Sequence, residues 1–217
     1  MVRDGFYYAL GLGAVAAVLW YLAMPLVLIA LPIVLAAFFL WFFRDPNRVV
    51  PQEPGQIVSP ADGLVTEAEW IETTSGNRLR LSIFLNVFDV HVNRSPVSGT
   101  VKVVELRAGQ FLNAMKPESV LHNEQTLIVI DAGGYSVSFK QIAGLLARRI
   151  VCTVKAGDRV ERGQRVGLIK FGSRVDVLLP AEAELKVKTG SRVRGGSTVL
   201  AVVPQIGRES GTTAVVA

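Results

Sequence analysis

Apolar residues fill the first part of the chain almost without interruption. No Lys, Arg, Asp or Glu occurs between residues 5 and 43, although two prolines break the run. One spanning helix needs roughly 20 apolar residues, so this run is too long for a single simple span. It predicts two short helices, near residues 6–23 and 26–43, packed as a hairpin in a membrane segment of residues 1–43. One tilted span with an interfacial extension is the alternative. The run is also too long for a cleaved signal peptide.

The pattern changes after residue 44. Val, Ile and Leu now gather in short runs that Gly, Pro, Asp and Asn interrupt at intervals of about ten residues, which is typical of an all-β sandwich or barrel. The predicted strands are residues 79–85, 100–105, 126–131, 136–142, 149–155, 165–170 and 174–179. One short helix is expected near residues 109–116. We therefore predict a mostly β (α+β) body over residues 44–204 and a flexible tail over residues 205–217.

Two internal repeats refine the fold of the body. The pattern Pro-x-x-Gly-x-Val occurs at residues 60–65 and again at 96–101. Residues 154–166 recur as residues 187–199, with identical Val, Lys, Gly and Arg at corresponding positions. Glycine permits tight turns and valine suits a buried strand face. The pattern Val-Lys-x-Gly-x-x-Val-x-x-Gly resembles the hammerhead hairpin of biotinyl and lipoyl domains, which implies a barrel-sandwich-hybrid-like body.

Composition and charge narrow the class of function. The chain is 50% hydrophobic and 19% charged, against about 25% charged in a typical soluble domain. Arg3 and Asp4 cancel, so the body carries the whole net charge of +5. A single cysteine, Cys152, excludes a disulfide scaffold and a Cys-rich zinc site, and the two histidines lack ligand spacing, so no metal is expected. Aromatic residues do not interleave the basic ones, so an anionic lipid surface is favoured over nucleic acid.

Three side chains carry the candidate chemistry. Of the three Gly-Ser pairs, only Gly172-Ser173 is left unexplained by the second repeat. His91 is one of two histidines, and Asp62 precedes a glycine in a turn-like segment. A carboxylate that orients an imidazole, which in turn removes a hydroxyl proton, is the set that activates a serine. Spacing alone leaves open whether the three residues meet, and a hairpin turn, a structural histidine and a turn aspartate are the alternatives.

Several motifs, taken in order, resemble the short bacterial and archaeal phosphatidylserine decarboxylases, which are pyruvoyl enzymes. The resemblance runs from residue 42 to about residue 203, most of the body. The motifs are Phe-Phe-Arg-Asp-Pro (42–46), Ser-Pro-Ala-Asp-Gly (59–63), Phe-Asp-Val-His-Val-Asn-Arg-Ser-Pro (88–96), Asn-Glu (123–124), Gln-Ile-Ala-Gly (141–144), Arg-Arg-Ile (148–150) and Phe-Gly-Ser-Arg-Val-Asp (171–176). The hydrophobic N-terminal segment also fits the family.

The resemblance implies a proenzyme that cleaves its own Gly172–Ser173 bond. The Ser173 hydroxyl attacks the Gly172 carbonyl to give an ester, and β-elimination leaves a dehydroalanine that water converts to a pyruvoyl group and ammonia. The products are a β chain (residues 1–172) and an α chain (residues 173–217) that begins with the pyruvoyl cofactor. This group forms a Schiff base with phosphatidylserine and accepts electrons as CO2 leaves, as pyridoxal phosphate does.

The resemblance also implies roles for other residues. His91 is the expected base, oriented by Asp62, and Arg94 and Arg174 are candidates for binding the substrate phosphate. The longer bacterial relatives carry a second histidine where this chain has Arg94. His91 therefore serves both cleavage and decarboxylation, or another group, such as His122, shares the work.

Alternatives remain at this point. The serine head group can sit on another lipid backbone, as in archaetidylserine. A biotinyl or lipoyl carrier would use Lys116 of Ala-Met-Lys, although Pro117 and Glu118 do not continue the carrier motif. Arg44 and Arg48 at the exit of the apolar segment favour a cytoplasmic body on the inner membrane. The expected partners are the phospholipid, the membrane, the two chains of one precursor and, as among relatives, a second processed unit in a homodimer.

Overall fold

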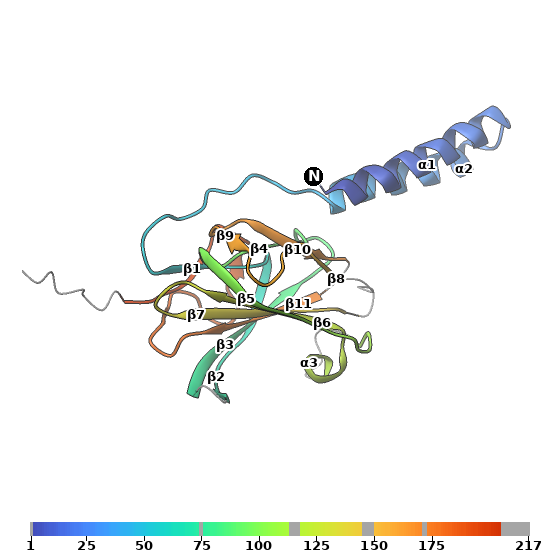
Figure 1. Cartoon of the computed structure of the whole chain (residues 1–217). Helices are drawn as coiled ribbons and strands as arrows, with labels where there is room; N and C mark the ends of the chain where they lie inside the picture. Colours follow the sequence, from blue (N-terminus) through green and yellow to red (C-terminus); the bar gives the residue numbers. More distant parts are fainter. Residues whose placement is uncertain (1, 74–75, 113–117, 145–149, 171–172, 205–217) are drawn as a thin grey trace, which may run out of the picture.

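The computed structural model describes residues 2–73, 76–112, 118–144, 150–170 and 173–204 (Figure 1). Its helices are α1 (Arg3–Tyr21), α2 (Leu26–Phe42) and α3 (Ser119–His122). Its strands are β1 (Gln56–Val58), β2 (Gly63–Thr73), β3 (Gly76–Leu85), β4 (Val92–Arg94), β5 (Gly99–Arg107), β6 (Gln125–Asp131), β7 (Ser136–Ile142), β8 (Ile150–Cys152), β9 (Arg159–Val160), β10 (Arg165–Ile169), β11 (Ser173–Leu179), β12 (Glu184–Leu185), β13 (Arg192–Val193) and β14 (Val199–Val202).

The predicted β body is confirmed. Eight strands form a curled sheet, half of a barrel, in the order β13-β2-β3-β11-β7-β6-β5-β9. Two three-stranded sheets, β1-β14-β12 and β4-β10-β8, complete the body. Each of the seven predicted strands coincides with an observed one, namely β3, β5, β6, β7, β8, β10 and β11. The predicted tail, residues 205–217, lies outside the described residues.

The predicted helix near residues 109–116 is wrong in its described part. Gln110 instead forms an isolated bridge with Asn123, and the single helical turn in this region, α3, begins later. Gly109 packs so closely on the backbone of His122 and Asn123 that a side chain would clash there. Residues 109–110 pack on residues 122–123 instead of forming a helix. The local hydrophobic pattern does not encode this contact between separate segments.

Strand β11 lies inside the large sheet and is paired along both edges. Val175 is opposite Ile83 of β3 and Gln141 of β7, with antiparallel pairing on each side. Its inward-facing Val175 and Val177 are fully buried in the main apolar core. Pairing with β3 therefore fixes the course of β11 from Ser173, and pairing with β7 adds to it from Arg174.

Each copy of the first sequence repeat pairs with one copy of the second repeat in the fold. The hairpin of residues 154–166 places Val160 of β9 opposite Gly99 of β5, and the hairpin of residues 187–199 places Val193 of β13 opposite Gly63 of β2. The turn glycines of the two hairpins adopt matching positive φ angles, 93° and 77° in the first and 87° and 76° in the second. The repeated sequences thus build two equivalent corners of the barrel.

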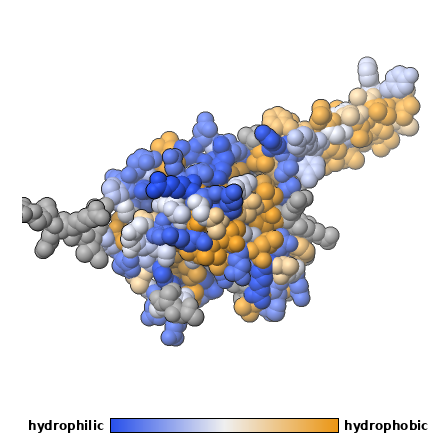
Figure 2. Space-filling view, viewed as in Figure 1, coloured by the Kyte–Doolittle hydropathy of each residue, from blue (hydrophilic) through white to orange (hydrophobic). Residues whose placement is uncertain are grey.

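The N-terminal segment forms the predicted helical hairpin, which projects away from the body (Figure 1). Helices α1 and α2 pack on each other, and Ala23, with φ 53°, lies in the turn between them. Large apolar side chains are exposed along both helices, and Figure 2 shows the hairpin as a mostly hydrophobic arm on a largely hydrophilic body. No helix in the described part of the chain combines the length and apolarity needed to cross a membrane.

A close approach at Gly99 yields a stability prediction. A Cβ on residue 99 would collide with the backbone carbonyl of Asp131 on β6. Gly99→Ala should therefore lower the free energy of unfolding by about 1–3 kcal/mol, as overpacking does. Gly134→Ala is the control, because a Cβ there meets nothing within 4 Å. Equal denaturant midpoints for the two variants would contradict this account of the corner.

Candidate functional site

Ser173 is the first residue of β11 and is completely buried. Its backbone pairs with Leu85 of β3. Among the described residues, no group forms a hydrogen bond with its hydroxyl oxygen. A buried hydroxyl without a partner is costly, so its presence calls for an explanation such as a reactive role. The preceding residue of the predicted cleavage site, Gly172, lies outside the described residues.

His91 lies just before β4 and is 2% exposed. Its Nδ1 is 3.0 Å from the carbonyl oxygen of Asp89. A carbonyl can only accept, so Nδ1 carries the hydrogen and Nε2 holds the lone pair in the neutral ring. Burial lowers the pKa of His91 to about 4, so the ring is neutral at pH 7. The His91 ring is therefore neutral, with its hydrogen on Nδ1 and its lone pair on Nε2.

The strand that leads toward Ser173 is attached to His91. The backbone N–H of Ile169, the last residue of β10, donates to the carbonyl oxygen of His91 at 3.3 Å. Only three residues separate Ile169 from Ser173. The fold therefore brings the predicted base next to the end of β10, four positions before Ser173 in the sequence.

Asp62 does not make the predicted hydrogen bond to His91. Within the described part of the chain, its carboxylate accepts two hydrogen bonds from Arg48, at 2.9 and 2.7 Å, and one from the backbone N–H of Gly195 at 2.8 Å. Burial raises its pKa, against the opposing effects of these bonds. Ser98 is at the corresponding position of the first repeat and accepts from the backbone N–H of Arg162 in the same way. These bonds place the Asp62 carboxylate at a barrel corner, and its expected role in orienting His91 stays a prediction.

The loop of Asp62 nevertheless lies beside the strand of His91. The carbonyl oxygen of Pro60 accepts from the backbone N–H of Arg94, at the end of β4, at 2.9 Å. The charge of Asp89, whose carbonyl contacts His91, also raises the pKa of Asp62. Asp62 and His91 therefore belong to one region, joined through their backbones rather than by a direct side-chain bond.

Arg174, a predicted phosphate ligand, is held by internal partners. Its guanidinium is buried and donates to Asp176 at 2.6 Å, to Glu67 at 2.7 and 3.2 Å, and to Ser82 at 2.6 Å. Although burial opposes its charge, the two carboxylates raise the pKa of Arg174. The expectation that Arg174 binds the substrate phosphate stays a prediction, and two internal carboxylates already pair with its charge.

Arg94 is also held by internal partners. It donates to Asp45 at 2.7 Å and to the carbonyl oxygens of Gly163 and Pro46 at 2.9 and 3.2 Å. Burial lowers its pKa, and Asp45 opposes this effect. Arg94 ties the connection after α2 to the barrel, so the structure does not support its expected role as a phosphate ligand.

The base of the helical hairpin covers this region. The Phe42 ring packs on the His91 ring, with centroids 4.4 Å apart. Lys170, which directly follows β10, forms an ion pair of 3.1 Å with Asp4 of α1 and lies over the Tyr8 and Phe43 rings. Sequence reasoning assigned no role to Phe42 or Lys170, since only the fold brings the hairpin against this end of the barrel.

The other sequence candidates lie elsewhere. Lys116, the carrier-type lysine, falls outside the described residues. His122 ends the single turn of α3 and is exposed. Within the described ranges, no group of three or more His, Cys, Asp or Glu side chains could hold a metal ion.

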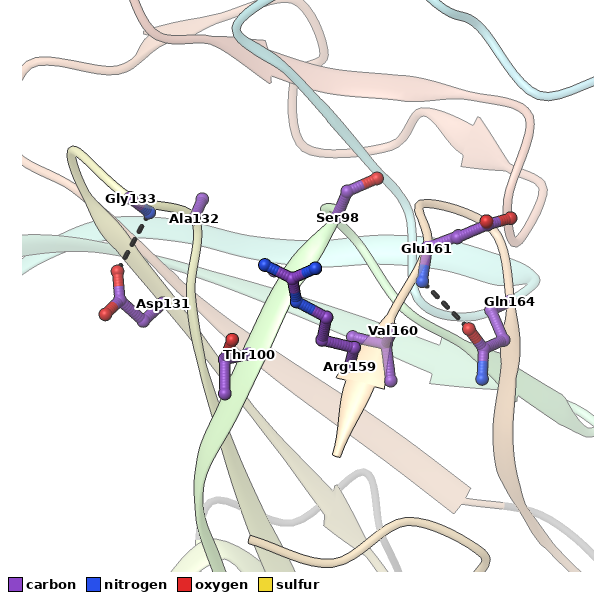
Figure 3. Close-up of a pocket in the computed structure, with 10 residues that line it drawn as sticks. Ser98, Thr100, Asp131, Ala132, Gly133, Arg159, Val160, Glu161 and Gln164 are labelled. Atoms are coloured by element: carbon purple, nitrogen blue, oxygen red, sulfur yellow. Dashed lines mark hydrogen bonds between the residues drawn. The ribbon is translucent and has the colours of Figure 1, made fainter. Parts of the chain in front are cut away.

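One surface pocket of the described structure is separate from Ser173 and His91. It has a volume of ≈ 600 Å³ and lies beside Thr100 on β5, the turn after Asp131 and the hairpin of β9 (Figure 3). Its walls are held by local bonds, from Gly133 N–H to Asp131 and from Glu161 N–H to Gln164. None of the residues proposed from the sequence lines it. The buried serine–histidine region is therefore the better candidate for chemistry.

Comparison with known proteins gives one consistent result. The family model described as phosphatidylserine decarboxylase matches residues 35–201. The chain is 52% identical over 202 residues to a phosphatidylserine decarboxylase proenzyme of Solibacter usitatus, covering 93% of this chain and 96% of that one. Proteins with the same name from Symbiobacterium thermophilum (50% identity; 79% and 81% covered) and Oleidesulfovibrio alaskensis (46%; 88% and 89%) are also similar.

Proposed function

This chain belongs to the phosphatidylserine decarboxylase family, and from this premise we propose that it works through a pyruvoyl group made from its own Ser173. The enzyme converts phosphatidylserine to phosphatidylethanolamine and CO2 in phospholipid biosynthesis. The observation that carries the proposal is the buried hydroxyl of Ser173, which lacks a hydrogen-bond partner among the described residues. Ser173 is also the first residue of β11, a strand with a partner on each side. After the proposed cleavage, this pairing would hold the new N-terminus of the α chain in place.

In the proposed maturation, Ser173 supplies the nucleophile and His91 the base. Nε2 of His91 takes the hydroxyl proton as the oxygen attacks the carbonyl carbon of Gly172. The imidazole then gives this proton to the peptide nitrogen, which leaves that carbon as the amine of residue 173 while the ester forms. Glycine at 172 shields this carbonyl least. A neutral imidazole is ready to accept a proton without first losing one, which the buried environment of His91 favours. When formed, the pyruvoyl group supplies a ketone that accepts electrons from the substrate.

Asp62 enters the proposal as a positioning residue. Its carboxylate holds Arg48 and the turn at Gly195, and the adjacent Pro60 is bonded to β4. Removing the negative charge would loosen this corner and shift the strand that begins directly after His91. Asp62 therefore acts on the base through the backbone.

The two product chains are expected to stay together without a covalent link. The α chain would contribute β11, which β chain strands β3 and β7 flank, and also β14, which pairs with β1. Every one of these contacts is formed before cleavage. The fold thus explains how one precursor yields a stable two-chain enzyme.

The apolar hairpin is proposed to bind the membrane that holds the substrate. It exposes Leu26 and Leu31 on α2, and its base contacts both His91 and Lys170. A lipid head group cannot reach far from its bilayer, so the site must lie close to the surface. The net charge of +5 favours anionic lipid, and Arg44 and Arg48 favour the cytoplasmic face of the inner membrane.

Ser173→Ala tests the nucleophile. We expect a single uncleaved chain on a denaturing gel and no decarboxylase activity, because no hydroxyl is left to attack. Ser191→Ala is the matched control, since that serine follows a glycine in a repeat turn and bonds only locally. Two product chains from Ser173→Ala would refute the assigned bond.

His91→Ala should slow cleavage by about 10²–10⁴-fold, the usual contribution of a general base. Asp62→Asn should slow it less, and His122→Ala should not slow it. Newly synthesised precursor in a cell-free system provides the rates. Normal maturation of His91→Ala would remove His91 from the cleavage step.

The same assay tests the protonation of His91. The base form is lost only as the pH falls through about 4, the pKa of the buried ring. Cleavage at pH 5.5 should therefore stay within about twofold of its rate at pH 7.5, whereas an ordinary histidine of pKa about 6.5 would be roughly 90% protonated there. A tenfold loss at pH 5.5 would contradict a neutral buried base.

Leu26→Glu combined with Leu31→Glu tests the hairpin. Both leucines are exposed, so the variant should cleave normally but bind phosphatidylserine vesicles at least about tenfold more weakly, because charged groups resist burial in lipid. Val49→Glu, an exposed position outside the hairpin, is the control. Unchanged sedimentation of the double variant with vesicles would exclude the hairpin as the membrane contact.

A further inference from the structure

Three buried polar groups on the inner face of the barrel lack partners. Within the described part of the chain, Oγ of Ser173, Oγ1 of Thr126 and Oε1 of Gln141 form no hydrogen bond. Thr126 is 1% exposed and Gln141 is fully buried. Buried polar atoms are nearly always paired, so three such atoms in one region mark a place where another molecule supplies partners.

The strand register places the three side chains on one face. Thr126 of β6 is directly opposite Gln141 of β7, and Gln141 is directly opposite Val175 of β11. Ser173 is two residues before Val175, so its side chain points to the same face. Diagonal neighbours of this kind have Cα atoms about 7–8 Å apart, within reach of a long side chain. Gln141 therefore borders residue 173, and Thr126, one strand farther away, borders Gln141.

The hydrogen bonds of Asn93 fix which atom Gln141 presents. The carbonyl oxygen of Pro60 can only accept, so the NH2 group of Asn93 faces it, at 3.5 Å. Oδ1 of Asn93 then accepts from Nε2 of Gln141 at 2.8 Å. Oε1 is thus the amide atom of Gln141 without a partner, and the site offers an acceptor there rather than a donor.

We propose that Oε1 of Gln141, assisted by Oγ1 of Thr126, accepts hydrogen bonds from the amino group of the serine head group. This inference rests on the proposed function of residue 173. A neutral primary amine has two N–H bonds and one lone pair. Acceptors that bind the N–H bonds turn the lone pair toward the ketone of residue 173. Gln141 and Thr126 thereby become binding residues for the reacting end of the substrate.

A neutral acceptor also suits the chemistry better than a carboxylate. A carboxylate would stabilise the ammonium form, which has no lone pair to donate. An amide oxygen and a hydroxyl bind the amine without imposing that charge. Two acids of the sheet, Glu67 and Asp176, form ion pairs with Arg174 instead.

Gln141→Met and Thr126→Val test the proposal, since each keeps the approximate shape and removes the acceptor. The first readout is cleavage on a denaturing gel, and the second is reaction of the α chain with phenylhydrazine, which reports its ketone. The third is covalent capture of short-chain phosphatidylserine on the α chain by cyanoborohydride, followed by intact mass. Gln125→Met is the control, because Gln125 is a buried glutamine on β6 that faces the opposite side from Thr126.

We expect Gln141→Met and Gln125→Met to cleave and to react with phenylhydrazine like the unaltered protein. Half-maximal capture by Gln141→Met should need about 10–100-fold more lipid, the effect of losing one hydrogen bond to a reacting polar group. Thr126→Val should show a smaller shift in the same direction.

Unchanged capture by both variants would overturn the inference. It would also be overturned if both variants folded but failed to cleave, because the acceptors would then serve the Ser173 hydroxyl rather than the substrate. Failure of the unaltered protein to cleave or to react with phenylhydrazine would instead refute the proposed function itself.

Discussion

Backbone pairing along both edges of β11 is the constraint on which the rest of this protein depends. Neighbouring strands hold β11 from Ser173 onward, and its inward-facing valines are in the centre of the core. If the peptide bond before Ser173 is broken, this pairing keeps the new chain end in its original position. The same pairing keeps the Ser173 hydroxyl dry and without a partner among the described residues, which makes it costly to maintain and ready to react. The proposed self-cleavage and the proposed retention of both products thus depend on the same strand pairing.

The helical hairpin is coupled to the same end of the barrel. Phe42 covers His91, and burial by such groups keeps that ring neutral, while Lys170 pairs with Asp4 close to the proposed cleavage site. The segment suited to lipid is therefore also part of the wall around the base. The surface pocket near Thr100 is lined by none of these residues.

Much of this could be predicted from the sequence, and the failures have physical causes. Local alternation of Val, Ile and Leu gave every predicted strand, and the identical glycines gave the two barrel corners, because strand faces and turns are local properties. Ser173 stood out since its Gly-Ser pair had no counterpart in the repeat. Local sequence patterns could not predict the hydrogen-bond partners of Asp62, Arg94 and Arg174. Each depends on a residue far along the chain, such as Arg48 for Asp62 or Glu67 for Arg174. In the sequence alone, an arginine that is buried in an ion pair cannot be distinguished from a surface arginine that binds phosphate.

The most direct test of this account is the mass of the purified, unaltered protein under denaturing conditions. The account predicts two chains that separate only on denaturation. One should end at residue 172, and the other should begin at residue 173 with a carbonyl group in place of a free amine. A single species near the full mass of 23.5 kDa, with its serine intact, would contradict the central claim that Ser173 converts this chain into an enzyme.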